Sequence, residues 1–352
     1  MENSMIKKSC YANSGVLAAL TSAFLFGAGT PLAKLLLSTV SPWLLAGLLY
    51  LGSGIGLTLY RRLNKAPAVK LPRNEALWFA GAIIAGGIVA PVLLMFGLTK
   101  TPASGASLLL NAEGVFTALL AWFAFKENFD RRIAFGMIAI VAGAVVLSWQ
   151  GGASFAGLWP SLALLGACLA WGIDNNFTRK VSLSDTTWIA SIKGLIAGSV
   201  NLALAFMLGA SLPPLPNLLG AMMVGFLSYG VSLALFVVGL RCLGTARTGA
   251  YFSVGPFIGA VIALAFGEPL TLPLVLAGAL MALGIWLHLT EHHAHEHTHA
   301  EIEHEHKHMH DEHHQHEHDT PATGISHSHK HQHSELEHEH NHFPDAHHQH
   351  EH

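Results

Sequence analysis

The sequence predicts an all-helical integral membrane protein, with ten transmembrane helices in two inverted repeats of five, followed by a disordered tail. Three observations lead to this fold class. Hydrophobic residues make up 51% of the chain and almost all of them lie before the tail, so the body is more apolar than a soluble domain. The two halves of this body share a pattern of residues. All 25 histidines lie at or after His288, so the tail differs chemically from the body.

Apolar stretches close to the ~20 residues that a helix needs to cross a bilayer recur along the body. The first stretch is too long for a signal peptide and no small-residue cleavage site ends it, so it is predicted to remain as a span. The chain therefore divides into a cytosolic N-terminus (1–13), a first repeat (14–150), a second repeat (151–289) and a tail (290–352). The predicted spans are residues 14–37, 42–60, 76–98, 102–124, 132–149, 156–178, 186–208, 217–239, 246–266 and 270–289.

Charge is distributed unevenly along the chain. Up to Leu287 there are 17 Lys and Arg against 8 Asp and Glu, a net charge of +9. Of the whole-chain totals of 19 Lys and Arg and 22 Asp and Glu, 2 and 14 therefore lie after Leu287, a net charge of −12. If the N-terminus is cytosolic, 14 Lys and Arg fall on the cytosolic side, whereas the outer connections hold only Lys100, apart from Lys34 at the outer end of the first span. Cytoplasmic loops carry the excess of Lys and Arg. Both termini are therefore predicted to be cytosolic.

The two halves repeat the same residue patterns at nearly constant spacing. An aromatic-glycine pair precedes a basic residue in the first and sixth spans, as Phe26-Gly27 with Lys34 and Trp171-Gly172 with Arg179. A Phe-x-Glu pattern ends the fourth and ninth spans, as Phe125 with Glu127 and Phe266 with Glu268. Because each half has an odd number of spans, the second half must be inverted, and such repeats place a substrate site near the bilayer midplane.

In these residues the chain resembles the EamA family of the drug/metabolite transporter superfamily, over roughly residues 14–289. The resemblance implies ten helices, cytosolic termini and transport, usually export, of small organic metabolites across the bacterial inner membrane. It does not imply a substrate, because the members differ widely. The family often has a proline kink in span four, where this chain reads Asn111-Ala112-Glu113-Gly114; the matching segment of span nine keeps the proline as Pro256.

Glu113 is the first candidate for chemistry, because it lies at the centre of a predicted span. A carboxylate at bilayer depth costs several kcal/mol unless it is paired, protonated or hydrated. Burial favours its neutral, protonated form, so proton binding and release is a plausible coupling step. The alternative is a protonated or hydrogen-bonded glutamate that only joins helices.

A second group of polar residues ends the sixth span and continues on the seventh. Helix depths place Asp174 and Lys193 about one turn apart, so an ion pair is expected, with Glu113 as the alternative partner of Lys193. Buried pairs often set conformation, so both a gate and a substrate contact remain open for this group. The complete substrate and coupling set is Glu113, Asn111, Asp174, Asn175, Asn176, Lys193 and Trp171.

Other residues of the body have less specific expectations. Lys34 and Arg179 lie near opposite membrane faces and either extend into the interface or help to close gates. Glu127 and Glu268 precede helix starts, where a helix dipole would stabilise a carboxylate, and this structural role is favoured over a role in transport. Two tyrosines, Tyr229 and Tyr251, either line a pocket or pack against lipid. Small residues that allow close approach of helices are Gly27, Gly29, Gly86, Gly87, Gly225 and Gly230.

The tail repeats His-x-His, and neutral imidazole is a good ligand for Zn, Ni, Co and Cu ions. With few apolar residues the tail is expected to be disordered without metal. A solubilising tail and a pH-sensitive tail are the alternatives. The candidate metal ligands are His295, His297, His299, His304, His306, His308, His310, His327, His329, His331, His333, His338, His340 and His342.

Together these patterns predict an inner-membrane secondary transporter that exports a small organic metabolite or drug by alternating access, with a cytosolic metal-binding tail. The alternatives are a divalent metal-ion exporter fed or regulated by the tail and a membrane-anchored metal sensor. No nucleophile with a base and no phosphate loop is recognisable, so an enzyme is not expected. The expected partners are a small solute, the lipid bilayer and divalent metal ions, without nucleic acid and with a homodimer left open. No cofactor is required.

Overall fold

The computed structural model describes residues 12–69, 71–125, 131–148, 155–181, 184–243, 251–289, 294–299, 302–308, 327–333 and 336–341. The chain divides into a helical unit that ends at Glu291 and a tail unit, His292–Pro344. The first half of the helical unit contains α1 (Ala12–Leu36), α2 (Pro42–Leu63), α3 (Arg73–Ala82), η1 (Ile83–Val89), α4 (Ala90–Lys100), α5 (Ala103–Leu109), α6 (Ala112–Phe125) and α7 (Arg131–Ser148). The second half contains α8 (Phe155–Val181), α9 (Thr186–Met207), α10 (Leu215–Gly225), η2 (Phe226–Val231), α11 (Ser232–Leu243), α13 (Gly255–Ala265) and α14 (Leu272–Leu289).

Local sequence signals mark where these helices begin and end. Pro42 opens α2, where its missing N–H costs no hydrogen bond. The side chain of Asp185 caps α9 by accepting a hydrogen bond from the N–H of Trp188. The segments after α9 and α13 pass through Gly209 and Gly267, whose φ values of 85° and 96° favour glycine.

In the described residues, six helical segments are long and apolar enough to cross a membrane. Three further apolar helices are shorter. Helix α8 covers the predicted sixth span, residues 156–178. Ten membrane-spanning helices therefore stay a prediction, although each predicted span contains helix. The six segments are Gly15–Leu36, Pro42–Leu63, Glu75–Lys100, Ala103–Leu120, Thr186–Met207 and Leu215–Phe236.

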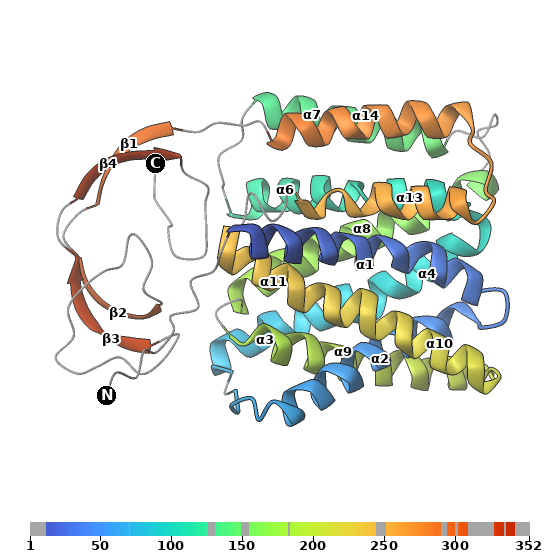
Figure 1. The fold of residues 1–352 in the computed structure, drawn as a ribbon, viewed down its shortest axis with the longest axis horizontal. Helices are drawn as coiled ribbons and strands as arrows, with labels where there is room; N and C mark the ends of the chain where they lie inside the picture. The colour runs from blue at the N-terminus through green and yellow to red at the C-terminus, as the bar shows by residue number, and fades with distance from the viewer. Residues whose placement is uncertain are drawn as a thin grey trace. The chain divides into compact units, whose positions relative to one another are not determined.

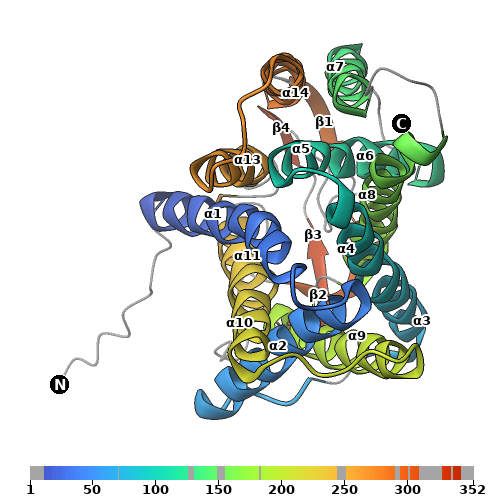
Figure 2. The same ribbon diagram turned by 90° about the vertical axis from the view of Figure 1, so that its right-hand side faces the viewer.

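The packing of the helices is symmetric between the two halves, so that each contact of a helix in one half has a counterpart in the other half. Helix α2 packs on α9 and α7 packs on α14, each pair joining equivalent helices of the two repeats. Likewise, α1 packs between α11 and α13, as its equivalent α8 packs between α4 and α6. Figure 2, viewed approximately along the helices, shows these neighbours side by side. The core of the body therefore lies between the halves.

Glycines allow several of these close approaches, as the sequence predicts. A Cβ on Gly27 of α1 would lie 3.0 Å from the carbonyl carbon of Gly255 on α13. A Cβ on Gly225 of α10 would lie 2.6 Å from Cα of Leu49 on α2. Because such contacts leave no space for a side chain, the helix backbones meet directly at these points.

Two pairs of local irregularities occur at equivalent positions in the halves. The π-helices η1 and η2 interrupt the third helix of each repeat, and their first residues, Ile83 and Phe226, are 143 positions apart. The fourth helix is interrupted at Leu110 and Asn111 in the first half and at Ser253 and Val254 in the second. The departure at Asn111-Ala112-Glu113-Gly114 thus keeps an interruption without proline. Non-helical backbone at membrane depth is tolerated only where it is buried in protein or faces a water-filled cavity.

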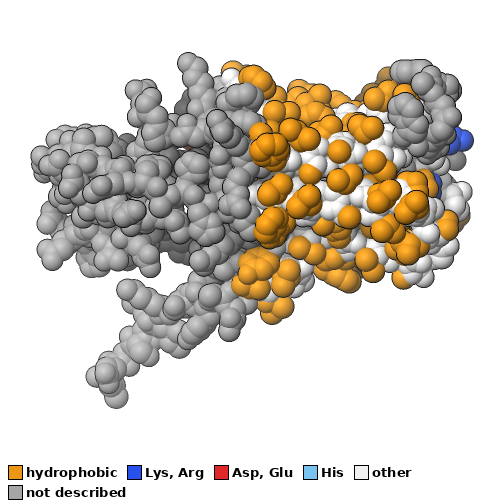
Figure 3. All heavy atoms as spheres, turned by 90° about the horizontal axis from the view of Figure 1, so that it is seen from above, with side chains coloured by type: hydrophobic (Ala, Val, Ile, Leu, Met, Phe, Trp, Pro, Cys, Tyr) orange, Lys and Arg blue, Asp and Glu red, His pale blue; other side chains and the backbone are white. Residues whose placement is uncertain are grey.

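The outside of the helical body is apolar. Large hydrophobic side chains such as Leu77, Met207 and Phe123 are exposed on several helices. Figure 1 shows the helices running side by side, and Figure 3 shows one face of the body covered with hydrophobic side chains. Exposed apolar surface of this extent suits a lipid environment.

Parts of the tail form backbone ladders. Strand β1 (Ala294–His299) pairs antiparallel with β4 (Leu336–Asn341), and β2 (Ile302–His308) pairs antiparallel with β3 (His327–His333). The sequence predicts disorder throughout the tail, and these four segments differ from that prediction. The His-x-His alternation has the two-residue period of a strand, which is compatible with such pairing.

Glu268 joins the second half to a helix start in the first. Its two carboxylate oxygens accept hydrogen bonds from the backbone N–H groups of Ala103 (2.6 Å) and Ser104 (2.9 Å), at the N-terminus of α5. As predicted, this glutamate binds a helix N-terminus, but the helix is α5 of the other half and not α14, which follows Glu268 in the chain. Its counterpart Glu127 lies outside the described residues.

Replacing Glu268 by glutamine is expected to lower the free energy of unfolding by about 1 to 2 kcal/mol, because the amide loses both the charge and one acceptor oxygen. Thermal unfolding in detergent measures this change. Lys100→Gln, at the exposed end of α4, is the control and should leave the melting temperature unchanged. Equal melting temperatures of Glu268→Gln and wild type would contradict the capping role.

Candidate functional site

Glu113 lies in the first turn of α6, directly after the interruption of the fourth helix. Its Oε1 accepts a hydrogen bond from Nδ2 of Asn175 on α8 at 2.8 Å. The same amide also lies 3.2 Å from Oγ1 of Thr117, one turn further along α6. The N-terminal end of a helix favours negative charge. Glu113, on α6 of the first half, thus contacts α8 of the second half.

Asn176 strengthens this contact through its own amide group. Its Nδ2 donates to the backbone oxygen of Thr117 at 3.2 Å and to the oxygen of Gly172 at 2.8 Å. Asn176 is buried, whereas Asn175 is exposed. The buried Asn176 therefore binds α6 to α8, and the exposed Asn175 holds the Glu113 carboxylate.

Asp174 and Lys193 form the ion pair that the helix depths predict. Lys193 Nζ donates to both carboxylate oxygens of Asp174; the Asp174 side chain is buried, and the Lys193 side chain is largely buried. Thr178 also donates from Oγ1 to Asp174 Oδ1 at 2.9 Å. Because Lys193 is paired with Asp174, its alternative partnership with Glu113 is not formed. The described part of the chain shows no salt bridge to Glu113, which leaves two carboxyl groups for one ammonium group in this cluster.

The π-helix η1 is hydrogen-bonded to the same region. Its Gly86 oxygen accepts from the hydroxyl of Tyr50 at 2.6 Å and from Nε1 of Trp171 at 3.1 Å. The absence of a side chain at Gly86 is required, because a Cβ there would lie 2.5 Å from Cβ of Asp174. The predicted close approach at Gly86 is confirmed, and Trp171 contributes its indole N–H to the site.

Asn201 on α9 completes the polar lining of this region. Its Nδ2 donates to the backbone oxygens of Gly87 at 3.2 Å and Ile88 at 3.4 Å. Its Oδ1 is buried without a hydrogen-bond partner among the described residues. A buried acceptor without a partner is costly.

An aromatic row lies next to the polar cluster. The rings of Tyr50 and Tyr229 are 5.4 Å apart between centroids, and Tyr229 lies 6.4 Å from Phe26. Phe26 in turn lies 5.1 Å from Phe252. Tyr229 thus joins α2 to α1 near the site, whereas Tyr251 is only half-buried and has no ring contact among the described residues. Aromatic rings beside a few polar groups suit a small organic ligand.

Asn111 does not join the polar cluster around Glu113. Its Nδ2 donates to the oxygen of Leu108 at 3.0 Å and lies 3.8 Å from the sulfur of Met281 on α14. The side chain is used to satisfy the interrupted helix, because the turn at 110–111 frees backbone oxygens.

The two gate candidates lie on α1 and α8. Lys34 Nζ donates to the backbone oxygens of Leu98 at 2.6 Å and Thr99 at 3.3 Å, where α4 ends, and thereby satisfies carbonyl groups at a helix C-terminus. Arg179 lies on α8, and its side chain is outside the described residues. Whether either residue acts as a gate stays a prediction.

Of the predicted metal ligands, His310 and His342 lie outside the described residues, and the others belong to strands β1 to β4. The side chains of the tail are not described. Among the side chains that the structure does describe, no group of three or more His, Cys, Asp or Glu is arranged to hold a metal ion. Metal binding by the tail stays a prediction.

Sequence reasoning missed Thr117 and Tyr50. Thr117 lies four residues after Glu113 and therefore on the same helical face, a spacing visible in the sequence. Tyr50 is a polar-tipped aromatic residue inside an apolar span, but nothing in the sequence shows that its hydroxyl reaches the backbone of η1. The π-helix itself has no recognisable signal beyond the adjacent pair Gly86 and Gly87.

Asp185 lies at one end of the helical body, outside the spans, and binds Arg61 at the end of α2. The ion pair is 2.7 Å long, and Asp185 Oδ1 also accepts from Thr187 Oγ1 at 2.7 Å and from the N–H of Trp188 at 3.1 Å. Burial raises the pKa of Asp185, but the hydrogen bonds from Thr187, Arg61 and Trp188 outweigh burial, so the pKa is lowered overall.

This lowered pKa gives a pH-dependent contribution to stability. Because the folded-state pKa lies below the unfolded value of about 3.9, the contribution is present above that pH and is lost as the pH falls through the folded pKa. Asp185→Asn is expected to lower the free energy of unfolding by less than about 1 kcal/mol at pH 7, because the pair is partly exposed. The difference in melting temperature from wild type should shrink at pH 3; a difference independent of pH would contradict this role.

Comparison with known proteins gives the family of the chain. The family model described as the EamA-like transporter family matches twice, over residues 13–149 and 158–290. The chain belongs to the EamA-like transporter family. The two matches correspond to the two halves that pack as equivalent pairs, so the protein is a multi-pass membrane transporter with a repeated domain.

The similar proteins agree with this assignment. The chain is 27% identical to an uncharacterized transporter of Methanothermobacter thermautotrophicus over 294 residues, covering 78% of this chain and 85% of that protein. It is 22% identical to the uncharacterized transporter YyaM of Bacillus subtilis, covering 55% of this chain and 66% of that protein. Purine permease 2 of Arabidopsis thaliana is 38% identical over 72 residues, 20% of each chain. A crystal structure 20% identical to this chain has the same fold, with a TM-score of 0.60 over 79% of this chain and 98% of that one.

Proposed function

We propose that this EamA-like transporter exports a small organic metabolite or drug by alternating access, with Glu113 as the carboxylate that couples transport to protons. The observation that carries the proposal is the position of Glu113, which receives a neutral hydrogen bond from Asn175 across the two halves, beside the Asp174–Lys193 pair. A carboxylate without a cationic partner at this depth gains by binding a proton. Proton binding there acts on the contact between α6 and α8.

The paired irregularities support alternating access. Interruptions of the fourth helix and π-helices in the third occur at equivalent places in the two inverted halves. Discontinuous helices at a repeat interface are typical of transporter substrate sites, and the two halves then exchange conformations to open the site to either face. The Asp174–Lys193 pair joins α8 to α9 beside η1 and is proposed to set one of these conformations.

The solute is proposed to be organic because aromatic rings and amide groups line the region. Tyr50, Tyr229 and Trp171 offer apolar faces, while Asn201 Oδ1 offers an acceptor. The local match to a purine permease makes nucleobases the first solutes to test. The proposed location is a bacterial inner membrane with both termini in the cytosol, as the Lys and Arg distribution predicts, and export is the direction that the resemblance to the EamA family implies.

The tail is proposed to bind divalent metal on the cytosolic side. In the antiparallel ladders, histidines are directly opposite one another, as His297 with His338 and His306 with His329. Opposite residues share a face of the ladder and have Cβ atoms about 5 Å apart, which suits two imidazole ligands of one Zn, Ni, Co or Cu ion. Such binding would buffer metal or link transport to metal load.

The test uses proteoliposomes with an internal pH dye, to which candidate organic solutes or Zn²⁺, Ni²⁺ and Co²⁺ are added. Proton flux driven by an organic solute, retained after removal of residues 291–352, is the expected result. Flux driven by a metal ion and lost with the tail would overturn the proposal in favour of a metal-ion exporter. Isothermal titration measures metal binding by the full chain and by the chain without residues 291–352. Equal metal binding by the two would contradict the proposal that the tail binds metal.

A further inference from the structure

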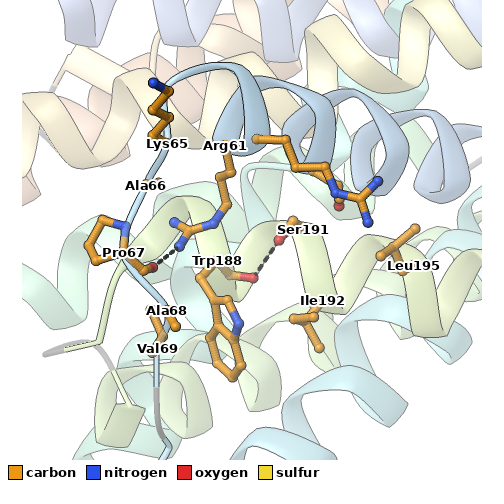
Figure 4. Close-up of a pocket in the computed structure, with 12 residues that line it drawn as sticks. Arg61, Lys65, Ala66, Pro67, Ala68, Val69, Trp188, Ser191, Ile192 and Leu195 are labelled. Carbon is orange, nitrogen blue, oxygen red and sulfur yellow. Dashed lines mark hydrogen bonds between the residues drawn. The ribbon is translucent and has the colours of Figure 1, made fainter.

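A cavity of about 480 Å³ lies away from the Glu113 cluster, at one end of the helical body. Its wall is formed by the last turn of α2, the following segment to Val69, and the first turns of α9. Figure 4 shows the Arg61 guanidinium directed to the oxygen of Pro67, above Trp188, with Ile192 and Leu195 along α9. The candidate span Pro42–Leu63 ends here, so the cavity lies where the bilayer meets water.

The polar side of the cavity is basic. Arg61, Arg62 and Lys65 line it, and none of its lining residues is acidic. Arg61 is part of the wall, because it binds Asp185 at 2.7 Å and the oxygen of Pro67 at 2.8 Å. Arg62 and Lys65 are exposed. Two cationic side chains beside a cavity without acidic lining favour an anion.

The other side of the cavity is largely apolar. The indole of Trp188 stacks on the ring of Phe79, with centroids 5.6 Å apart and an interplanar angle of 27°. Ile192, Leu195 and Val69 complete this side. A soluble anion needs only the basic side, whereas a ligand with a charged phosphate and hydrocarbon chains matches both. Tryptophan at the interface commonly packs against lipid in this way.

We propose that this cavity binds the headgroup of an anionic phospholipid, with the phosphate between Arg62 and Lys65 and the first part of an acyl chain against Ile192 and Leu195. Arg61 and Asp185 hold the segment 64–69 on α9 and thereby keep the cavity open. A lipid bound here contacts α2 and α9, the closely packed pair that joins the two halves. Basic pockets between transmembrane helices are suited to such headgroups.

The test uses the full-length protein in detergent, titrated with phosphatidylglycerol, phosphatidylcholine or inorganic phosphate. Phosphatidylglycerol is expected to raise the melting temperature, and native mass spectrometry is expected to show it retained where phosphatidylcholine is not. The double variant Arg62→Gln/Lys65→Gln should bind phosphatidylglycerol about 30-fold more weakly, since both basic contacts are lost. The charge-conserving double variant Arg62→Lys/Lys65→Arg and the distant variant Lys100→Gln are the controls, and both should bind as wild type does.

Several outcomes would overturn this site. Equal stabilisation by phosphatidylcholine would show that the headgroup charge is not recognised. Stabilisation by inorganic phosphate that phosphatidylglycerol does not increase would assign the cavity to a free anion. Unchanged phosphatidylglycerol binding by the Arg62→Gln/Lys65→Gln variant would place the lipid elsewhere. The melting temperatures without lipid show that each variant is folded, and the mass spectrum of the wild type tests lipid selectivity independently of any variant.

Discussion

Glu113→Gln is expected to reduce solute-driven proton flux in proteoliposomes to the level of protein-free vesicles. Glutamine keeps the size of the side chain and an oxygen that can accept from Asn175 Nδ2, which bonds Glu113 Oε1 at 2.8 Å. It cannot bind and release a proton in the physiological range. The contact between α6 and α8 should therefore persist while coupling is lost, and solute exchange without a proton gradient should continue.

The matched control is Glu268→Gln, which removes a carboxylate that caps α5 and lies outside the Glu113 cluster. This variant should be less stable but should keep proton flux per folded molecule. Proton flux that persists in Glu113→Gln would remove Glu113 from the coupling step. Loss of solute exchange together with proton flux would instead indicate that Glu113 contacts the solute.

Lys193→Gln is expected to cause the largest loss of stability, about 3 to 5 kcal/mol in the free energy of unfolding, because it leaves the buried Asp174 carboxylate without its cation. Asp174 is buried and Lys193 is largely buried, with side-chain relative exposures of 8% and 12%. Of the described hydrogen bonds to this carboxylate, only the one from Thr178 Oγ1 would then remain. Unfolding in detergent by heat and by denaturant measures the change.

The double variant Asp174→Asn/Lys193→Gln should recover most of this stability, because neither buried charge remains uncompensated. If the pair sets a conformation of the transporter, the double variant should be folded but slow in transport. Equal stability of Lys193→Gln and wild type would contradict the stabilising role of the pair. Lys100→Gln, an exposed lysine at the end of α4, controls for the loss of a positive charge.

Much of the helical arrangement could be predicted because it follows from local apolar runs. A span such as 42–60 needs only enough consecutive apolar residues, and its Pro42 start is a local signal. The ion pair of Asp174 with Lys193 was also predictable, since rise per residue places both at similar depths. The contact of Glu113 with Asn175 was not, because depth does not give the rotation of one helix about another.

Sequence by itself determined that the chain is a repeated, apolar, helical membrane protein with polar residues in the fourth, sixth and seventh spans, because hydrophobic length, charge bias and repeats are local properties. Only the tertiary structure decided which of these residues meet: Asn175 turns to Glu113, whereas Asn111 turns to its own helix and Met281. It also decided that Gly86 lies in a π-helix whose oxygen binds Tyr50 and Trp171. The physical reason is that a side chain's partners depend on helix packing and backbone irregularity, which arise from contacts between residues distant in the chain.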